Sequence, residues 1–278
     1  MSAGIRVIAG VILLVATAGF TAPAAAQLQQ AWTWCENKEK GSLDLQISGC
    51  TTVIQSGKES KKNLGIAFSN RGDAYRDQGQ YDRAIQDYDQ AVKLDSTDAI
   101  ALLNRGLSYR RKGLYDRAIE DYGRAIKADP KFVSAFNNRG SAYLYKAEYT
   151  RAIQDFDQAI RIDPNYAIAF NNRCYARAYG DQLDQALKDC NESLRLRPNH
   201  AGTLDHRALV HLKRGDIANA IVDYDAALKV DPKLSDALYG RGLAKRKKGD
   251  AAGAEADIAA AKAIDSSVVE RVEKVGVK

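Results

Sequence analysis

The chain has 278 residues, of which 45% are hydrophobic and 27% are charged, the balance of an ordinary folded protein. Its net charge of +6 is spread along the sequence as alternating Asp and Arg and forms no basic stripe, which argues against nucleic-acid binding. We therefore expect a surface of mixed charge and no nucleic-acid partner.

The first 26 residues have the features of an export signal. They carry one charged side chain, Arg6, followed by the apolar run Val7–Phe20 and by small residues that end in Ala24-Ala25-Ala26. A run of this length suits a signal peptide and is short for a membrane-spanning helix. We expect residues 1–26 to be cleaved after Ala26, which leaves a periplasmic protein without stable membrane insertion. An uncleaved membrane anchor is the alternative.

A spacing of 34 residues repeats through most of the remaining chain. Asn-Arg-Gly ends at Gly72, Gly106 and Gly140, and a tyrosine follows each of these glycines by three residues. An alanine recurs six times without a gap, as Ala84, Ala118, Ala152, Ala186, Ala220 and Ala254, and four units close with Pro130, Pro164, Pro198 or Pro232. A fixed period of this length indicates stacked supersecondary units.

Each unit is predicted to be a pair of antiparallel helices. Small residues such as Gly72 and Ala84 are needed where the two helices cross, and turn signals such as Lys112-Gly113 separate them. The closing proline ends the second helix. Ser96 and Ser266 replace this proline in the first and last units, and we expect each to cap the helix that follows.

This pattern resembles the tetratricopeptide-repeat (TPR) family, whose units carry small residues at positions 8, 20 and 27, aromatic residues at 11 and 24, and proline at 32. The resemblance implies an all-α fold, a right-handed α-solenoid of about six helical hairpins over residues 65–268, with units starting near 65, 99, 133, 167, 201 and 235. Residues 27–64 are predicted to form an N-terminal capping helical hairpin and residues 269–278 a C-terminal capping helix or tail, because terminal units must hide an apolar face.

Four cysteines in an exported chain favour disulfides. Cys174 and Cys190 stand at positions 8 and 24 of the fourth unit, which an antiparallel hairpin places opposite each other, and Cys35 and Cys50 have nearly the same separation. We predict the pairs Cys35–Cys50 and Cys174–Cys190, each stabilising the fold by about 3 kcal/mol in the chain-entropy model. The alternative is that Cys174 and Cys190 are simply small buried residues.

Arginine recurs at position 7 and aspartate at position 23 of all six units. The arginines are Arg71, Arg105, Arg139, Arg173, Arg207 and Arg241, and the aspartates are Asp87, Asp121, Asp155, Asp189, Asp223 and Asp257. A guanidinium can form two parallel hydrogen bonds with a carboxylate. We predict a structural ladder of ion pairs, and the spacing permits pairing either within a unit or between neighbouring units.

Asparagine recurs at position 6 of the first four units, as Asn70, Asn104, Asn138 and Asn172. This position lines the concave groove of TPR solenoids, and the series resembles the asparagine ladder with which some TPR proteins hold the main chain of an extended peptide. An amide suits this role because it both donates and accepts. Asn137 and Asn171 at position 5, with Arg76 and Arg110 at position 12, are predicted to enlarge the same surface; the alternative is a solvated polar face without function.

No catalytic motif accompanies the three histidines, His200, His206 and His211. We expect neither an enzyme nor a cofactor or metal site, although Asp205 and His206 leave a weak metal site open. The predicted function is a non-catalytic scaffold or adaptor for an unidentified protein or peptide. The alternative is a structural component that assembles with itself or with the cell envelope through convex or end surfaces.

Overall fold

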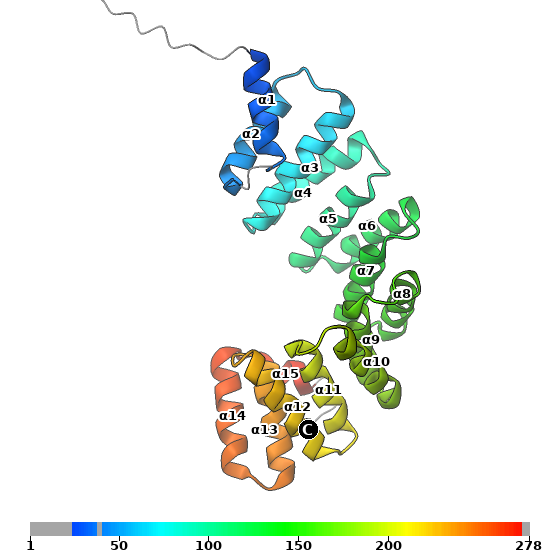
Figure 1. Cartoon of the computed structure of the whole chain (residues 1–278), viewed down its shortest axis with the longest axis vertical. Helices are drawn as coiled ribbons and strands as arrows, with labels where there is room; N and C mark the ends of the chain where they lie inside the picture. Colours follow the sequence, from blue (N-terminus) through cyan, green and yellow to red (C-terminus); the bar gives the residue numbers. More distant parts are fainter. Residues whose placement is uncertain (1–23, 38–40, 274–278) are drawn as a thin grey trace, which may run out of the picture.

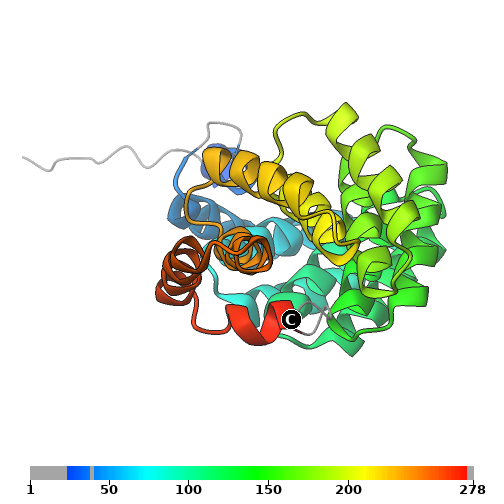
Figure 2. The same cartoon turned by 90° about the horizontal axis from the view of Figure 1, so that it is seen from below.

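The computed structural model describes residues 24–37 and 41–273. Over these ranges the chain contains fifteen α-helices and no strand, and the helices follow one another in an extended, curved stack (Figure 1). Seen from one end, the stack curves so that its N-terminal and C-terminal helices overlap in the view (Figure 2). The prediction of an all-α, right-handed solenoid is confirmed.

Six consecutive helix pairs form the body of the solenoid. Their first helices are α3 (Lys61–Asp77), α5 (Ala99–Arg111), α7 (Val133–Tyr145), α9 (Ala167–Tyr179), α11 (Ala201–Lys213) and α13 (Ser235–Lys248). Their second helices are α4 (Tyr81–Leu94), α6 (Tyr115–Ala128), α8 (Tyr149–Ile162), α10 (Leu183–Leu196), α12 (Ile217–Val230) and α14 (Ala251–Ile264). A hairpin of α1 (Ala24–Cys35) and α2 (Leu43–Gln55) precedes them, and α15 (Val268–Glu273) follows.

The two ends of the chain lie partly outside the described residues. The predicted signal peptide is described only at Ala24–Ala26, which begin α1, and the predicted C-terminal tail is described as far as Glu273. Within residues 24–37 and 41–273, no helix combines the length and the apolar character that a membrane crossing requires.

Close helix crossing explains the small residues of the repeat. A Cβ atom added at Gly72, Gly106 or Gly140 would lie 2.8, 2.6 or 2.7 Å from the aromatic ring opposite it, which belongs to Tyr88, Tyr122 or Phe156. These distances are too short for real carbon atoms, so the ring of the second helix packs directly on the backbone of the first. The rings are fully buried and fill the centre of each unit.

The helix caps differ from the expectation at Ser96 and Ser266. Asp98, not Ser96, caps α5, because its Oδ1 accepts from the backbone N–H groups of Ile100 and Ala101, both at 3.0 Å. Ser96 lies inside the preceding turn, which the hydrogen bond from Asp98 N to Asp95 O closes at 3.3 Å. In the last unit Asp265 Oδ1 accepts from the backbone N–H of Ser267 at 2.9 Å, and α15 begins only after that residue.

Candidate functional site

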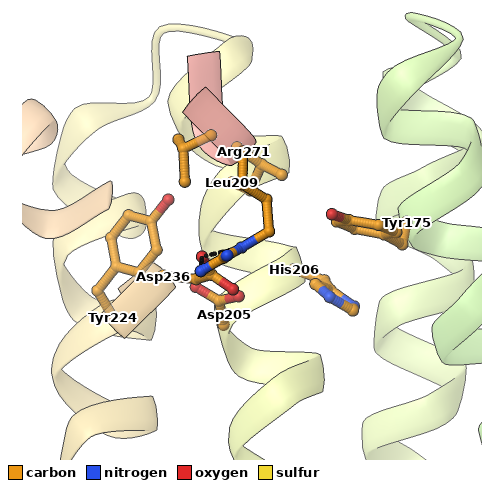
Figure 3. A pocket seen from close by; sticks show the side chains of 8 residues that line it. Tyr175, Asp205, His206, Leu209, Tyr224, Asp236 and Arg271 are labelled. Atoms are coloured by element: carbon orange, nitrogen blue, oxygen red, sulfur yellow. Dashed lines mark hydrogen bonds and ion pairs between the residues drawn. The ribbon is translucent and has the colours of Figure 1, made fainter. Parts of the chain in front are cut away.

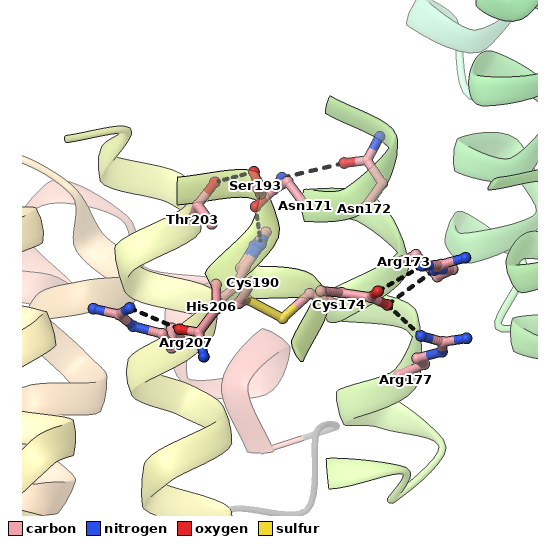
Figure 4. The surroundings of a disulfide bond; sticks show 12 residues. Asn171, Asn172, Arg173, Cys174, Arg177, Cys190, Ser193, Thr203, His206 and Arg207 are labelled. Carbon is pink, nitrogen blue, oxygen red and sulfur yellow. Dashed lines mark hydrogen bonds and ion pairs between the residues drawn. A yellow bond between two sulfur atoms is a disulfide. The ribbon is translucent and has the colours of Figure 1, made fainter. Parts of the chain in front are cut away.

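Both predicted cysteine pairs are bonded. Cys35 and Cys50 join α1 to α2 with a Cα–Cα distance of 4.5 Å, and Cys174 and Cys190 join α9 to α10 at 5.4 Å (Figure 4). All four side chains are fully buried, so each bond lies in the core of its hairpin. The second disulfide therefore fixes the two helices beside the middle of the concave surface.

The arginine and aspartate ladder forms within the units. In each unit the Arg Nε and Nη2 atoms donate to both carboxylate oxygens of the Asp sixteen residues later, at 2.6–2.9 Å. The aspartates are 2–7% exposed. The hydrogen bonds that Arg71 and Arg139 donate to Asp87 and Asp155 raise the pKa of both arginines, whereas burial raises the pKa of Asp121 and Asp155 against the effect of their arginines. The choice that the sequence left open is settled in favour of pairing within a unit.

The same arginines also reach the preceding unit. In the first unit Arg71 Nη1 donates to Thr51 of α2. In four later units Arg Nη1 donates to the side chain at position 25 of the preceding unit, and these acceptors are Asp89, Asp157, Asn191 and Asp225. Arg139 has Gly123 at this position, which offers no side chain. Each of the other arginines thus ties three helices together.

A central groove of about 900 Å³ runs along the concave surface. The first helices α5, α7, α9, α11 and α13 supply most of its wall, and α8 and α15 also contribute. Of the residues predicted for the site, the groove brings together Arg110, Asn137, Asn138 and Asn172. Asn70, Asn104, Asn171 and Arg76 are not among its lining residues.

Most of the asparagine amides form hydrogen bonds within the solenoid. Asn104 Nδ2 donates to Asp73 at 2.9 Å, and Asn172 Nδ2 donates to Asn137 Oδ1 at 3.0 Å, so these two amides join neighbouring first helices. Asn138 Nδ2 donates instead to Ser134 O of its own helix at 2.8 Å. Asn138 keeps one amide hydrogen and its oxygen for a ligand in the groove. Asn172 Nδ2 also donates to Ser141 Oγ at 3.4 Å, and its Oδ1 accepts from Asn171 Nδ2 at 3.3 Å, so Asn172 can offer a ligand only the second lone pair of its oxygen.

Two predicted residues are held away from the groove by their neighbours. Arg76 donates to Asp73 at 3.0 Å and to Asp77 at 3.1 Å, which ties its guanidinium to its own helix. Asn171 is 8% exposed, and its Oδ1 lies 2.9 Å from Nδ1 of His206. Burial and the nearby His200 lower the pKa of His206 to about 4, so this imidazole is neutral at neutral pH.

An aromatic row that the sequence reasoning missed forms one wall of the groove. The row consists of Tyr149, Tyr179, Tyr175 and His206, with ring centroids 5.1, 4.8 and 4.3 Å apart from one ring to the next. The hydroxyl groups of Tyr175 and Tyr179 lie 2.8 Å apart. Rings fixed against each other in this way present a rigid apolar surface with polar edges.

A signal for these rings was present in the repeat. Tyr115 and Tyr149 both stand at position 17, and Tyr145 and Tyr179 both stand at position 13 of their units. Position 17 of one unit stacks on position 13 of the next, at 5.0 Å for Tyr115 with Tyr145. Within the described residues, no group of three or more His, Cys, Asp or Glu side chains is arranged to hold a metal ion.

Comparison with known families agrees with this geometry. One family model, described as TPR repeat, matches residues 72–113 and 208–249, and another, described as tetratricopeptide repeat, matches 105–167 and 137–201. The chain belongs to the tetratricopeptide-repeat family. TPR solenoids are protein–protein interaction scaffolds, and this TPR protein has that architecture.

Solved structures show the same fold. A tetratricopeptide repeat protein from Parabacteroides merdae is 18% identical, with a TM-score of 0.73 over 90% of this chain and 99% of that one. PilW, a type IV pilus biogenesis factor, is 21% identical, with a TM-score of 0.66 over 76% and 98% of the two chains. YrrB, a TPR protein with an unusual peptide-binding site, is 22% identical, with a TM-score of 0.55 over 69% and 97%. A search of the curated proteins found no match.

Proposed function

We propose that this TPR protein is an exported, non-catalytic adaptor that holds an extended segment of a partner protein in the central groove. The observation that carries the proposal is the groove itself, which combines the rigid aromatic row with the amides of Asn138 and Asn172. Flat rings contact side chains of many kinds, and amides pair with main-chain groups whatever the sequence. This combination suits a peptide partner better than one small molecule.

Export to the periplasm is part of the proposal. Two buried disulfides support it, because disulfides persist in oxidising compartments and are rare in the cytosol. The expected mature protein starts at Gln27. Intact-mass measurement of the protein recovered from the periplasm tests this, and a mass that includes residues 7–20 would contradict cleavage.

Site-specific photo-crosslinking in cells tests the groove. Tyr145 lines the groove and is 62% exposed, and Val222 on α12 has the same exposure, 63%, outside it. A crosslinker at position 145 is expected to capture a foreign polypeptide that position 222 does not capture. Capture of a second copy of this chain from position 222 alone would favour self-assembly instead.

Removal of the two groove amides gives a quantitative test. Two hydrogen bonds of about 1 kcal/mol each predict that Asn138→Ala with Asn172→Ala weakens partner binding by about 30-fold. Asn191→Ala on α10, outside the groove, is the control. Unchanged binding with unchanged thermal stability would remove the asparagines from the site.

A further inference from the structure

The C-terminal end of the groove opens into a small side pocket of about 40 Å³, which we call the Asp205 pocket. It is lined by Tyr175, Asp205, His206, Tyr224, Asp236 and Arg271, together with Leu209 and Val272. Tyr175, His206, Asp236 and Arg271 line both the pocket and the groove, so the two spaces are continuous. Figure 3 shows these side chains converging from α9, α11, α12, α13 and α15.

Asp205 is the unusual group in this pocket. The residue is only 8% exposed, and its side chain points into the pocket (Figure 3). Within the part of the chain that the structure describes, no group donates a hydrogen bond to its carboxylate or forms an ion pair with it. A carboxyl group that is mostly buried and has no partner is stabilised either by a proton or by an external donor that reaches it through the pocket.

The neighbouring charges favour a cation over an anion. Arg271 Nη2 lies 2.7 Å from Asp236 and 2.8 Å from Asp265, so its guanidinium is already shared between two other carboxylates. His206 is neutral at neutral pH. With Asp205 ionised, the pocket carries two carboxylates against one guanidinium, and one added positive charge balances it.

The size of the pocket suits a small cation. A volume of about 40 Å³ admits roughly three groups the size of a water molecule. An ammonium group and its first methylene fit this space, whereas a planar guanidinium with four heavy atoms would extend from it into the adjoining groove. The three N–H donors of an ammonium match the carboxylates of Asp205 and Asp236 and the hydroxyl of Tyr224, and its stem meets the stacked rings of Tyr175 and His206.

We infer that the Asp205 pocket binds a primary ammonium group, from a lysine side chain or a free N-terminal amine of the partner segment. This inference rests on the proposed peptide groove and adds a requirement for one amine at its C-terminal end. In the protein alone, burial and Asp236 raise the pKa of Asp205 well above its ordinary value, against the opposing effect of Arg271. Binding of the ammonium therefore displaces a proton from Asp205 and strengthens as the pH rises.

The pocket is tested directly with n-butylammonium, which carries the head group and stem of lysine. Its titration into the full chain at pH 8 is expected to shift the NMR signals of the His206 and Tyr175 rings in a saturable way. n-Butanol has the same stem without charge and is expected to have no effect. Asp205→Asn is expected to abolish the shift, and Asp184→Asn, whose side chain is 83% exposed, is expected to preserve it. Equal shifts in the wild type and Asp205→Asn would overturn the inference.

Peptides separate the two amine sources and the two proposals. Twelve-residue peptides selected on the immobilised chain from a random library would be resynthesised with lysine replaced by norleucine, with arginine in its place, or with the N-terminus acetylated. Removal of one of the two amines, the lysine amine or the N-terminal amine, is expected to weaken peptide binding at least about tenfold. Asp205→Asn is expected to weaken it by the same factor. If selected peptides crosslink to position 145 but bind equally well without their amines, the pocket inference is refuted and the groove proposal is retained. If no peptide is selected, the groove proposal fails, and the butylammonium titration still decides the pocket.

Discussion

Cys174 occupies the position of a glycine in the three preceding units, and Cys190, which is bonded to it, occupies the position of the aromatic residue that faces that glycine. In those units the ring fills the space between the helices, as Tyr122 does against Gly106. In the fourth unit a covalent bond spans that space instead. The disulfide thus replaces a packing contact locally, and the residues of the preceding units show which substitutions could restore that contact.

Restoration of the packing contact should recover much of what loss of the disulfide removes. Cys174→Ala with Cys190→Ala is expected to lower the free energy of unfolding by about 3 kcal/mol. Cys174→Gly with Cys190→Phe rebuilds the contact of Gly140 with Phe156 and is expected to recover at least about 1 kcal/mol of this. Urea unfolding of both variants under oxidising conditions measures the difference. Equal stability would show that the site cannot accept the ring.

The ladder pairs should be sensitive to loss of one partner. Asp121→Ala leaves the guanidinium of Arg105, whose side chain is 12% exposed, with only Asp89 on the neighbouring unit. We expect a loss on the order of 3 kcal/mol, because a mostly buried charge loses its main partner. Asp82→Ala is the matched control: it breaks an ion pair with Lys112 in which the aspartate is 77% exposed, and is expected to cost about 0–1 kcal/mol. Equal losses, measured by urea unfolding, would mean that the ladder contributes no more than a surface pair.

The missing rung at Gly123 can be supplied. A Cβ at this residue would lie 3.6 Å from Arg139 Nη1, so Gly123→Asp has room to form the contact that Asp89 and Asp157 form with their arginines. We expect a gain of about 1 kcal/mol, from improved helix propensity and the new ion pair. The contribution of the ion pair to this gain should decrease in roughly 0.5 M salt, because the screening length there is only a few ångströms. Gly123→Ala gains propensity alone, so its effect should not depend on salt, and a salt-independent Gly123→Asp would contradict the new pair.

Asp205 should make the stability depend on pH. Its pKa is raised in the folded state above the ordinary value of 3.8, so the folded carboxyl holds its proton at pH values where the unfolded one has lost it. Folding therefore takes up a proton, and the contribution of this group to the free energy of unfolding falls as the pH rises above about 4. Asp205→Asn removes that fall and is expected to be about 1–3 kcal/mol more stable than the wild type at pH 8.

Unfolding of both proteins at pH 4.5, 6 and 8 measures this effect. The stability difference between Asp205→Asn and the wild type should grow with pH, whereas Asp184→Asn should show no such trend. A constant difference would mean that Asp205 is ionised across the whole range.

The sequence was sufficient for features that repeat every 34 residues. The helix pairs, the Arg71–Asp87 type of pair and the facing cysteines each follow from one hairpin geometry applied six times. The direction of the ladder needed the structure, because Arg105 contacts Asp121 of its own unit and Asp89 of the preceding one with different nitrogens. Symmetry of the spacing alone does not separate these two contacts.

The groove depended on residues that the repeat does not determine. Asn104 and Asn172 stand at the same position, yet one donates to Asp73 and the other to Asn137, because the neighbouring side chains differ. The Asp205 pocket depends on Arg271 in α15, which lies outside the repeat and whose place on the solenoid no periodicity predicts. Such sites arise where different units and the end helix meet.

The absence of a side chain at Gly123 has a consequence for how the solenoid opens. In a linear array each unit is stabilised by its own hairpin and by its two neighbours, so the weakest junction sets where partial unfolding stops. Arg139 lacks the link across the junction between the second and third units that the other arginines make. The stacking of Tyr115 on Tyr145 and the ion pair of Lys146 with Asp116 still join these two units, so the missing link lowers the stability of the junction without abolishing it. Gly123→Asp should therefore slow hydrogen exchange at this junction relative to the wild type. All the residues lining the groove except Arg110 lie C-terminal to the junction, so opening there leaves most of the binding surface intact.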